Sequence, residues 1–575
     1  MNFHLKMSHF FTFVLNSSMK KNLFWWISIS IVLCGIFSSH EFDGRYGRSI
    51  NGDGKAYYAY LPAIFIYQDP TFSFIDEMEL KYYPTDKSQF KDFRNKQKNG
   101  KYVNKTFPGL SILYAPFFFL SMFVAWICGF AVDGYSAPFQ WGIAFSHVAY
   151  FFIGLRFLLS VFRRLKIRDV VSYIVFIGLT FGTNSWYYLV YDHTVSHIHN
   201  FFLATVFIWL MLNWIQTKRI QYLGWSGIIL SLLIITRPTN GLMILFLPLL
   251  ILLSGKQLKD LITKEYFQVK SLIPHFFIGL IIFSIPFLLW KWQSDLWLVY
   301  SYNEEGFNFK QPHFFDFLYS YQKGWFVWSP LLFLSIVVSG FYFSKKSLFQ
   351  LVSFMFPVIL IIYVLSSWWC WTYGAGFGQR PMIDFLPFIA IGVALFLNEF
   401  KRINFVYFIV LPFCFLSIIQ SYQITNSILS GGTTTKEQYW SHFLQLKRDA
   451  PSVVVSEKWK LIDQKVLNSV QKMDKSHPFS QSIKSRQLKS VKIVVLSVEI
   501  ASNTHKPDLR LVLSNKDGTV YKDVFLGDFI SSSATQMEFK IELPDLKNEM
   551  LTFYVWNGDS DTEAEITRMG LKCYK

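Results

Sequence analysis

Long apolar runs constrain this 575-residue chain more than any other feature of its sequence. A run of about 20 mostly apolar residues is long enough to cross a bilayer as a helix. By that criterion the sequence predicts about 11 spans. The predicted spans are residues 22–40, 138–162, 170–190, 199–216, 220–236, 238–254, 273–291, 325–343, 348–367, 379–398 and 403–421. The predicted fold class is therefore a polytopic α-helical membrane protein.

The charge content agrees with this class. Only 16% of the residues are charged and 52% are hydrophobic, whereas soluble domains contain about 25% charged residues. A cytosolic enzyme of this size is thereby excluded. The 55 Lys and Arg exceed the 38 Asp and Glu, which gives a net charge of +17. Since the positive charges stand in short clusters between the apolar runs, they indicate membrane orientation and not nucleic-acid binding.

Basic clusters favour the cytoplasmic side of a membrane, which predicts the orientation of the chain. The run 22–40 follows Lys20 and Lys21 and lacks a small-residue cleavage site, so it reads as an uncleaved anchor after a cytoplasmic segment 1–21. The long loop 41–107 then lies outside. The apolar stretch 108–131 would begin and end outside, so we expect a juxtamembrane or re-entrant helix there. The chain is predicted to lie in the cytoplasmic (inner) membrane of a bacterium, with the N-terminus inside and the C-terminus outside.

The composition changes after the last predicted span, at the end of a membrane domain covering 22–421. Residues 422–490 are polar and read as a linker with some helix. Residues 491–575 alternate between apolar and polar positions in several short runs separated by turn signals such as Asn557-Gly558. Short strands at this spacing predict a small extracytoplasmic β-sandwich domain.

Asp53 is the most distinctive polar residue of the first outer loop. Gly52 and Gly54 flank it, so the backbone can turn tightly and leave the carboxylate projecting. A carboxylate at the membrane boundary can act as a general base or bind a metal ion. The aromatic stretch that follows, with Tyr57 and Tyr58, is typical of a helix lying at the interface. An ordinary solvated turn aspartate is the alternative.

A second outer loop contains Asp192, His193, His197 and His199. His193 and His197 have the i, i+4 spacing of one helix face, and these residue types are metal ligands. However, no HExxH sequence is present, and histidine is also common in polar loops. Asp192 is the more plausible functional residue, as a second acidic partner of Asp53, because both fall at the outer ends of spans.

Three cations are candidates for binding a phosphate at the outer boundary. Arg237 stands between two predicted spans, Arg380 follows a segment rich in glycine and aromatic residues, and Lys105 precedes Pro108. A guanidinium group can hold phosphate oxygens through two hydrogen bonds. The alternative for each is a side chain that reaches lipid headgroups or solvent.

Together these elements resemble the GT-C superfamily of membrane glycosyltransferases, which includes protein O-mannosyltransferases and lipid A aminoarabinose transferases. The matching features are Asp53 before Tyr57-Tyr58, the Lys105 to Pro108 element, the aromatic-rich end at Tyr191-Asp192 and the late Gly-Phe-Gly-Gln-Arg380-Pro. The sequence has Gly54 where a second acidic residue is commoner, and Thr-Phe-Pro in place of Lys-Pro-Pro.

The resemblance implies transfer of a sugar from a polyprenyl-phosphate donor to a glycan, lipid or protein acceptor at the outer face, with inversion. In this interpretation Asp53 and Asp192 are catalytic. The donor phosphate is held by Lys105, Arg237 and Arg380. The acceptor or another part of the substrate contacts Tyr57, Tyr58, His193, His197 and Gln379. A divalent metal ion is an open alternative, with Asp53, Asp192 and His193 as its ligands. Membrane lipids are the other expected partners, and nucleic acid is not one.

Two other classes of function are open. A transporter or flippase of a lipid-linked saccharide would also have many spans with charged residues near the boundary. Transporters usually place polar or broken segments at the bilayer midplane, whereas the polar residues here gather in the outer loops. A scaffold that displays the C-terminal domain would account for the tail but not for these loops.

Overall fold

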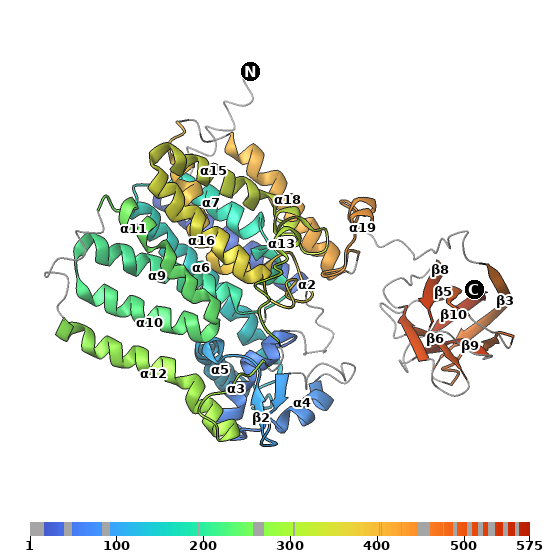
Figure 1. Cartoon of the computed structure of the whole chain (residues 1–575). Coiled ribbons are helices and arrows are strands. Elements are labelled where there is room, and N and C mark those ends of the chain that lie inside the picture. The colour runs from blue at the N-terminus through green and yellow to red at the C-terminus, as the bar shows by residue number, and fades with distance from the viewer. Residues whose placement is uncertain are drawn as a thin grey trace. The chain divides into compact units, whose positions relative to one another are not determined.

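The computed structural model divides the chain into two compact units (Figure 1). Unit 1 comprises Met1–Thr425 and Leu429–Leu444, and unit 2 comprises Asn426–Ile428 and Gln445–Lys575. The structure describes residues 17–39, 49–82, 93–193, 195–256, 269–302, 305–401, 403, 405–426, 428–446, 460–474, 476–486, 491–502, 509–515, 521–526, 535–543, 550–557 and 563–575.

Unit 1 is helical, and its helices follow the apolar runs of the sequence. It begins with α2 (Ser17–Ser39), α3 (Asp53–Phe65), α4 (Phe74–Tyr82) and a hairpin of β1 (Arg94–Lys96) and β2 (Tyr102–Asn104). Then follow α5 (Gly109–Cys128), α6 (Ala137–Arg164), α7 (Asp169–Phe181), α8 (Ser185–Val190), α9 (His197–Thr217), α10 (Ile220–Thr236), the 3₁₀ helix η2 (Pro238–Phe246), α11 (Leu247–Leu253) and α12 (Val269–Ser294). The last are α13 (Phe314–Tyr319), α14 (Trp325–Trp328), α15 (Pro330–Lys346), α16 (Leu348–Ser366), the 3₁₀ helix η5 (Arg380–Phe385), α17 (Leu386–Asn398), α18 (Val406–Thr425) and α19 (Lys436–Ser441).

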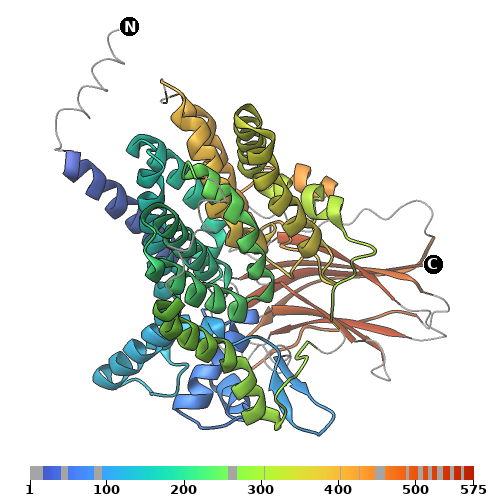
Figure 2. The same ribbon diagram turned by 60° about the vertical axis from the view of Figure 1, so that its left-hand side comes forward.

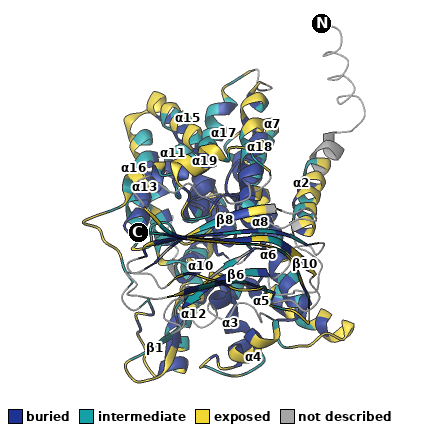
Figure 3. Ribbon diagram, turned by 90° about the vertical axis from the view of Figure 1, so that its right-hand side faces the viewer, coloured by how far each residue is buried: buried dark blue, intermediate teal, exposed yellow. Residues whose placement is uncertain are grey.

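Several of these helices are suited to a membrane. Within the described residues, seven are long and apolar enough to cross one. They are Gly109–Cys128, Ala137–Arg164, His197–Thr217, Ser271–Ser294, Leu348–Ser366, Arg380–Asn398 and Val406–Thr425. Large apolar side chains such as Trp126 and Phe408 are exposed on them, and Figure 3 shows exposed residues along α2, α15 and α16. An exposed apolar surface of this kind is typical of helices that face lipid, while the total of about 11 spans stays a prediction.

The stretch expected to be a juxtamembrane or re-entrant helix is a single helix, α5, of 20 residues. Pro116 lies inside it without interrupting it, and α5 packs along α6. Its length and apolar composition place it among the helices able to cross a membrane. The juxtamembrane or re-entrant placement of this helix stays a prediction, because its length and composition are also those of a span.

Two predicted spans begin with a 3₁₀ segment that runs directly into an α-helix. The run 238–254 consists of η2 and α11, and the run 379–398 consists of η5 and α17. Both 3₁₀ segments carry a proline directly after an arginine, at Arg237-Pro238 and Arg380-Pro381. Proline lacks the N–H that a regular α-helix needs in its interior. Arg237 directly follows the last residue of α10, and Arg380 is the first residue of η5.

The predicted inner loops come together in unit 1. Arg164 Nη1 donates to Gln216 Oε1 at 3.1 Å, and Lys346 Nζ pairs with Glu399 Oε1 at 2.8 Å. Arg168 donates to the carbonyl oxygen of Phe400 at 2.6 Å. The predicted outer loops meet at the other ends of α6 and α9, which lie side by side (Figure 1, Figure 2). The two groups of loops thus lie at opposite ends of these helices, while the side of the membrane that each faces stays a prediction.

The aromatic helix after Asp53 is not an exposed interfacial helix. In α3 every residue from Gly54 to Ala63 is buried, and the helix packs against α5. The phenol of Tyr58 donates to the carbonyl oxygen of Gly134, and that of Tyr60 to Thr106 at 2.7 Å. The expectation of a helix lying on the membrane surface is corrected: its aromatic side chains fill the interior of unit 1.

Unit 2 is the predicted β-sandwich. One antiparallel sheet has the strand order β3-β10-β5-β8 and the other the order β4-β9-β6-β7. Buried side chains from both sheets form one core, including Leu496, Val498, Leu511, Phe553 and Met569. The strands are β3 (Leu461–Met473), β4 (Ile483–Lys484), β5 (Ile493–Ser502), β6 (Leu509–Asn515), β7 (Tyr521–Phe525), β8 (Thr535–Glu542), β9 (Leu551–Asn557) and β10 (Ala564–Tyr574).

The boundary of this domain differs from the expected one. Residues 422–490 were expected to be a linker, but β3 and β4 lie inside that range and belong to the sheets. Strand β3 pairs with β10 along its whole length, from Leu461 to Met473. Most of its side chains are exposed or half-buried because it is an edge strand. Its polar sequence therefore resembles a linker.

Asp133, between α5 and α6, is the centre of a polar cluster. Its carboxylate accepts from Lys81 Nζ at 2.8 Å, from Tyr82 Oη at 2.5 Å and from the N–H groups of Tyr135 and Ser136 at 3.0 Å. Asp133→Asn should lower the stability of unit 1 by about 1.5 to 3 kcal/mol, the value of hydrogen bonds to a charged group. Thermal unfolding in detergent measures this, and an unchanged midpoint would contradict the structural role.

Candidate active site

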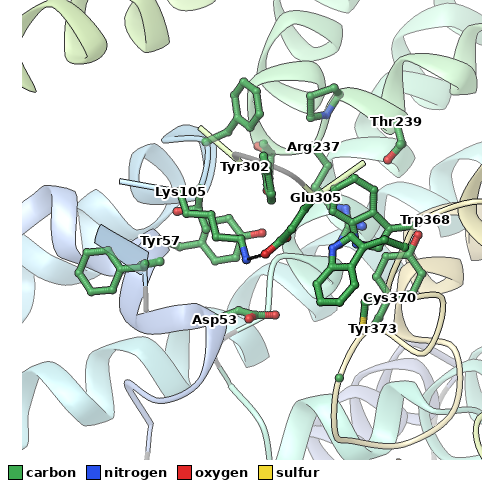
Figure 4. Close-up of a pocket in the computed structure, with 18 of the residues that line it drawn as sticks. Asp53, Tyr57, Lys105, Arg237, Thr239, Tyr302, Glu305, Trp368, Cys370 and Tyr373 are labelled. Atoms are coloured by element: carbon green, nitrogen blue, oxygen red, sulfur yellow. Dashed lines mark hydrogen bonds and ion pairs between the residues drawn. The ribbon is translucent and has the colours of Figure 1, made fainter. Parts of the chain in front are cut away.

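A cavity of about 630 Å³ opens among the predicted outer loops of unit 1. Figure 4 shows side chains from α3, from the segment after β2, from the end of α10 and from two long loops around one space. The polar and charged lining residues are Asp53, Tyr57, Lys105, Thr106, Thr236, Arg237, Thr239, Tyr300, Tyr302, Glu305, Cys370, Tyr373 and Arg380. Segments distant in sequence thus form one site.

Asp53 is the first residue of α3. Gly52 before it has a φ of +50°, a conformation that suits glycine, so the chain can turn sharply into the helix. The Asp53 carboxylate pairs with Arg380 Nη2, and 55% of the Asp53 side chain is exposed because it faces the cavity. The projecting carboxylate predicted from the two flanking glycines is present.

The cations around the cavity control the ionisation of Asp53. Removal from bulk water would raise the pKa of this carboxyl group, but Arg380, Lys105 and Arg237 outweigh that effect and lower the pKa below its ordinary value. The charge on Asp53 and its pairing with Arg380 are therefore present at any pH above the ordinary value. They are lost only as the pH falls through the lowered pKa.

This gives a prediction for the pH profile. For a reaction in which Asp53 takes part, kcat/KM should show no step caused by Asp53 between about pH 5 and about pH 8, because the group is ionised throughout. Any acidic limb in that window should be the same in wild-type and Asp53→Asn protein. An acidic limb near pH 6 that disappears in Asp53→Asn would contradict the direction of the shift.

Arg380 approaches Asp53 from a loop that is fixed at Gly376. Lys323 is fully buried, and its Nζ donates to the carbonyl oxygen of Gly376 at 2.6 Å. The N–H of Gly376 donates to the carbonyl oxygen of Gly431 at 3.0 Å. Gly376 has a φ of +127°, and a Cβ there would lie 2.7 Å from the hydroxyl of Tyr188. Only glycine fits this position, so the loop places Arg380 reproducibly.

Lys105 follows strand β2 and meets the long loop between α12 and α13. Its Nζ pairs with Glu305 Oε1 at 2.5 Å and lies 5.6 Å from the centre of the Tyr302 ring. The dashed line in Figure 4 marks this ion pair, and the Asp53 carboxylate lies in the same space. The backbone of Lys105 is held by Phe93 and Ser301, at 2.8 Å each.

Arg237 is held by a buried relay. Its Nη1 contacts His197 Nε2 at 3.2 Å, and His197 Nδ1 contacts Asp384 Oδ1 at 2.7 Å. Asn200 donates to the second oxygen of Asp384 at 2.9 Å. A guanidinium group can only donate, so His197 accepts on Nε2 and carries its proton on Nδ1. This neutral histidine links the charge of Arg237 to the buried carboxylate of Asp384.

Aromatic side chains form much of the remaining wall. They are Tyr57, Phe93, Phe107, Tyr300, Tyr302, Phe307, Trp368, Trp369 and Tyr373. Phe307 bridges to Trp368 through the backbone, and their ring centroids are 4.8 Å apart. The guanidinium of Arg237 lies over the ring of Tyr373 at 5.7 Å. The cavity therefore combines cations, carboxylates and flat apolar faces.

Five of the sequence-predicted residues line this cavity: Asp53, Tyr57, Lys105, Arg237 and Arg380. His197 lies behind the wall and contacts Arg237. The structure does not place Tyr58, Asp192, His193 or Gln379 in the lining.

The four predicted residues that do not line the cavity have other contacts. The ring of Tyr58 packs against Phe118 and Tyr135 in the core. His193 Nε2 contacts the carbonyl oxygen of Leu189 at 3.0 Å. Gln379 is buried and donates to the carbonyl oxygen of Trp371 at 3.3 Å. Asp192 follows α8 and is half-buried. None of these four lines the cavity, although Asp192 lies near enough to Arg380 to interact with its charge.

The proposed metal ligands do not form a cluster in the part of the chain that the structure describes. No group of three His, Cys, Asp and Glu side chains there is arranged to hold a metal ion. Asp53 is paired with Arg380, whereas His193 is directed to backbone at Leu189. The metal requirement stays a prediction from the resemblance.

Glu305 is the charged lining residue that sequence reasoning missed. It lies in the predicted outer loop 292–324, where no spacing or motif distinguishes it from its neighbours. The only usable signal was its location on the outer side, shared with Asp53 and Lys105. By sequence comparison, no protein-family model and no curated protein matches the chain.

Proposed function

We propose that this protein is a membrane glycosyltransferase that moves a sugar from a polyprenyl-phosphate donor to a glycan, lipid or protein acceptor. The observation that carries the proposal is the cavity in which Lys105, Arg237 and Arg380 surround Asp53 beside aromatic walls. Its volume, about 630 Å³, is in the range of sites for small organic ligands. Cations bind phosphate, and aromatic faces stack on sugar rings.

The donor phosphate is placed against the three cations. Arginine binds phosphate oxygens through two parallel N–H groups, so Arg237 and Arg380 are suited to a phosphodiester. The relay through His197 and Asp384 fixes Arg237, which limits the reorganisation required on binding. Negative charge that develops on the departing phosphate is stabilised by the same groups.

Asp53 is the proposed base. The oxygen of an acceptor hydroxyl attacks the anomeric carbon, while the bond from that carbon to the phosphate oxygen breaks and its electrons pass to the phosphate. The hydroxyl proton goes to Asp53. While Arg380 is paired with Asp53 the carboxylate is a weak base, because the pairing lowers its pKa. A phosphate that draws Arg380 away raises the basicity of Asp53 when it is needed. A direct displacement of this kind inverts the anomeric centre.

A flippase for lipid-linked saccharides would use a similar cavity but would leave the lipid intact. Mass spectrometry of donor lipid and envelope glycans from a deletion strain tests whether the protein is required for the modification, while conversion of the donor by purified protein separates a transferase from a flippase. A transferase predicts accumulation of the glycosylated polyprenyl phosphate and of an acceptor lighter by one sugar. Complementation by the wild-type protein should restore the normal donor level and the normal acceptor mass. Complementation by Asp53→Asn should restore neither. Normal acceptor mass in the deletion strain would contradict the proposal.

Cys370 offers a test of the side on which the cavity opens. It lines the cavity and is half-buried, whereas Cys414 and Cys573 are buried. In protein with Cys34→Ser and Cys128→Ser, a membrane-impermeant maleimide should label Cys370 in intact spheroplasts, and Cys370→Ser should abolish the signal. Labelling only after lysis would place the cavity on the cytoplasmic side.

A further inference from the structure

We infer that Glu305 and the phosphate of the ligand compete for Lys105, so that Glu305 limits how tightly the site holds a lipid phosphate and speeds its release. This inference rests on the proposed function insofar as the ligand is a phosphate. It assigns to Glu305 a role in ligand exchange that is distinct from the base Asp53.

The geometry leaves one ammonium group for two anions. Lys105 Nζ and Glu305 Oε1 are 2.5 Å apart, and both side chains line the cavity. They are only partly exposed, at 28% and 27%, so solvent screens their attraction incompletely. The ammonium has three N–H donors, so a phosphate oxygen can approach it beside Glu305, but the carboxylate already neutralises much of its charge. Full pairing of Lys105 with the phosphate therefore requires the Glu305 side chain to turn away.

Backbone contacts hold both partners while the side chains are free to exchange. The Lys105 N–H donates to the Phe93 carbonyl, and the Lys105 carbonyl accepts from Ser301. The Glu305 N–H donates to the Tyr302 carbonyl at 3.1 Å, and the Glu305 carbonyl accepts from the hydroxyl of Tyr300. Rotation of the Glu305 side chain alone can therefore open and restore the pair.

Removal of a charged residue from a binding site usually weakens ligand binding, and here the opposite is expected for Glu305. Removing the charge of Glu305 should tighten binding of a lipid phosphate about three- to tenfold, as expected for a partly buried ion pair that no longer competes. Removing Lys105 should weaken binding. Turnover of Glu305→Gln should become more sensitive to inhibition by free lipid phosphate by a similar factor, because this product leaves more slowly.

The experiment uses the purified full chain in detergent and farnesyl monophosphate as the probe. Binding is read from protection of Cys370 against a water-soluble maleimide, in protein with Cys34→Ser and Cys128→Ser. The half-protecting concentration should fall in Glu305→Gln and fall less in Glu305→Asp, whose shorter side chain retains the charge but weakens the pair. Size-exclusion profiles confirm that the variants are folded.

Two controls isolate competition from a general effect of charge. Glu399→Gln removes the same side chain from a Lys–Glu pair at Lys346, 2.8 Å apart and remote from the cavity, and should change nothing. In protein that already carries Lys105→Gln, Glu305→Gln should tighten the binding of farnesyl monophosphate much less. An equal gain in both backgrounds, or no gain in either, would overturn the inference. If Glu305→Gln binds farnesyl monophosphate more tightly but the protein transfers no sugar, the inference about Glu305 holds and the proposed function is wrong.

Discussion

Asp53→Asn protein should insert and fold like the wild type yet transfer sugar about 10²- to 10⁴-fold more slowly, the usual contribution of a general base. Asparagine keeps the size of the side chain but cannot take the acceptor proton. The pair with Arg380 is also lost, so lipid-phosphate binding should not weaken. The measurement is initial rate against donor concentration, with binding followed separately at Cys370.

Asp76→Asn is the matched control for this substitution. Asp76 is also paired with an arginine, Arg94, at 2.9 Å, and its side chain is 51% exposed against 55% for Asp53. It is absent from the cavity lining. Equal rates for Asp53→Asn and Asp76→Asn would remove the catalytic assignment and strengthen the flippase alternative.

Replacement of Arg380 should have the second-largest effect. Arg380→Ala removes a donor that the proposed function places against the departing phosphate, and loss of one such donor costs about 10²- to 10³-fold in rate. Arg380→Lys keeps the charge but loses the planar fork, so it should recover only part of the rate. The kinetic parameters kcat and KM for the donor are compared for both variants at saturating acceptor.

The control for the lysine substitution is Arg163→Lys, at an exposed arginine paired with Asp169 at 3.3 Å among the predicted inner loops. It should behave as wild type. If Arg380→Ala and Arg380→Lys both transfer at the parental rate, Arg380 is not part of the reaction.

Hydropathy was sufficient to locate most helices of unit 1, because an apolar run of the right length has few alternatives as a structure. The 3₁₀ segments η2 and η5, with which two of the predicted spans begin, were harder to predict. An Arg-Pro pair is compatible with the end of a helix or with a loop, and only the packing of residues 237–246 and 380–385 shows which is formed.

Two errors had the same physical origin: local pattern does not show what a segment packs against. The aromatic helix α3 would suit a lipid interface, but α5 and the surrounding core bury it. The edge strand β3 is polar because one side of it faces solvent, and its pairing with β10 depends on residues about 100 positions later in the chain.

The site was predictable in part because charged residues at the ends of apolar runs are few. Asp53, Lys105, Arg237 and Arg380 were identified in this way and line one cavity. Their partners were not, because the Lys105–Glu305 pair joins positions 200 residues apart and the His197–Asp384 pair joins positions 187 apart. Residue type suggested that His197 would contact substrate, whereas its contacts assign it to the support of Arg237.

The most direct test of the proposed sugar transfer does not require the identity of the sugar on the donor. Lipids extracted from a deletion strain, supplied with acceptor material from the same cells, are incubated with purified wild-type or Asp53→Asn protein and followed by mass spectrometry. The account predicts that wild type alone converts a glycosylated polyprenyl phosphate into free polyprenyl phosphate while an acceptor gains the mass of the same sugar. An unchanged lipid profile with active, folded wild-type protein, or equal conversion by Asp53→Asn, would contradict it.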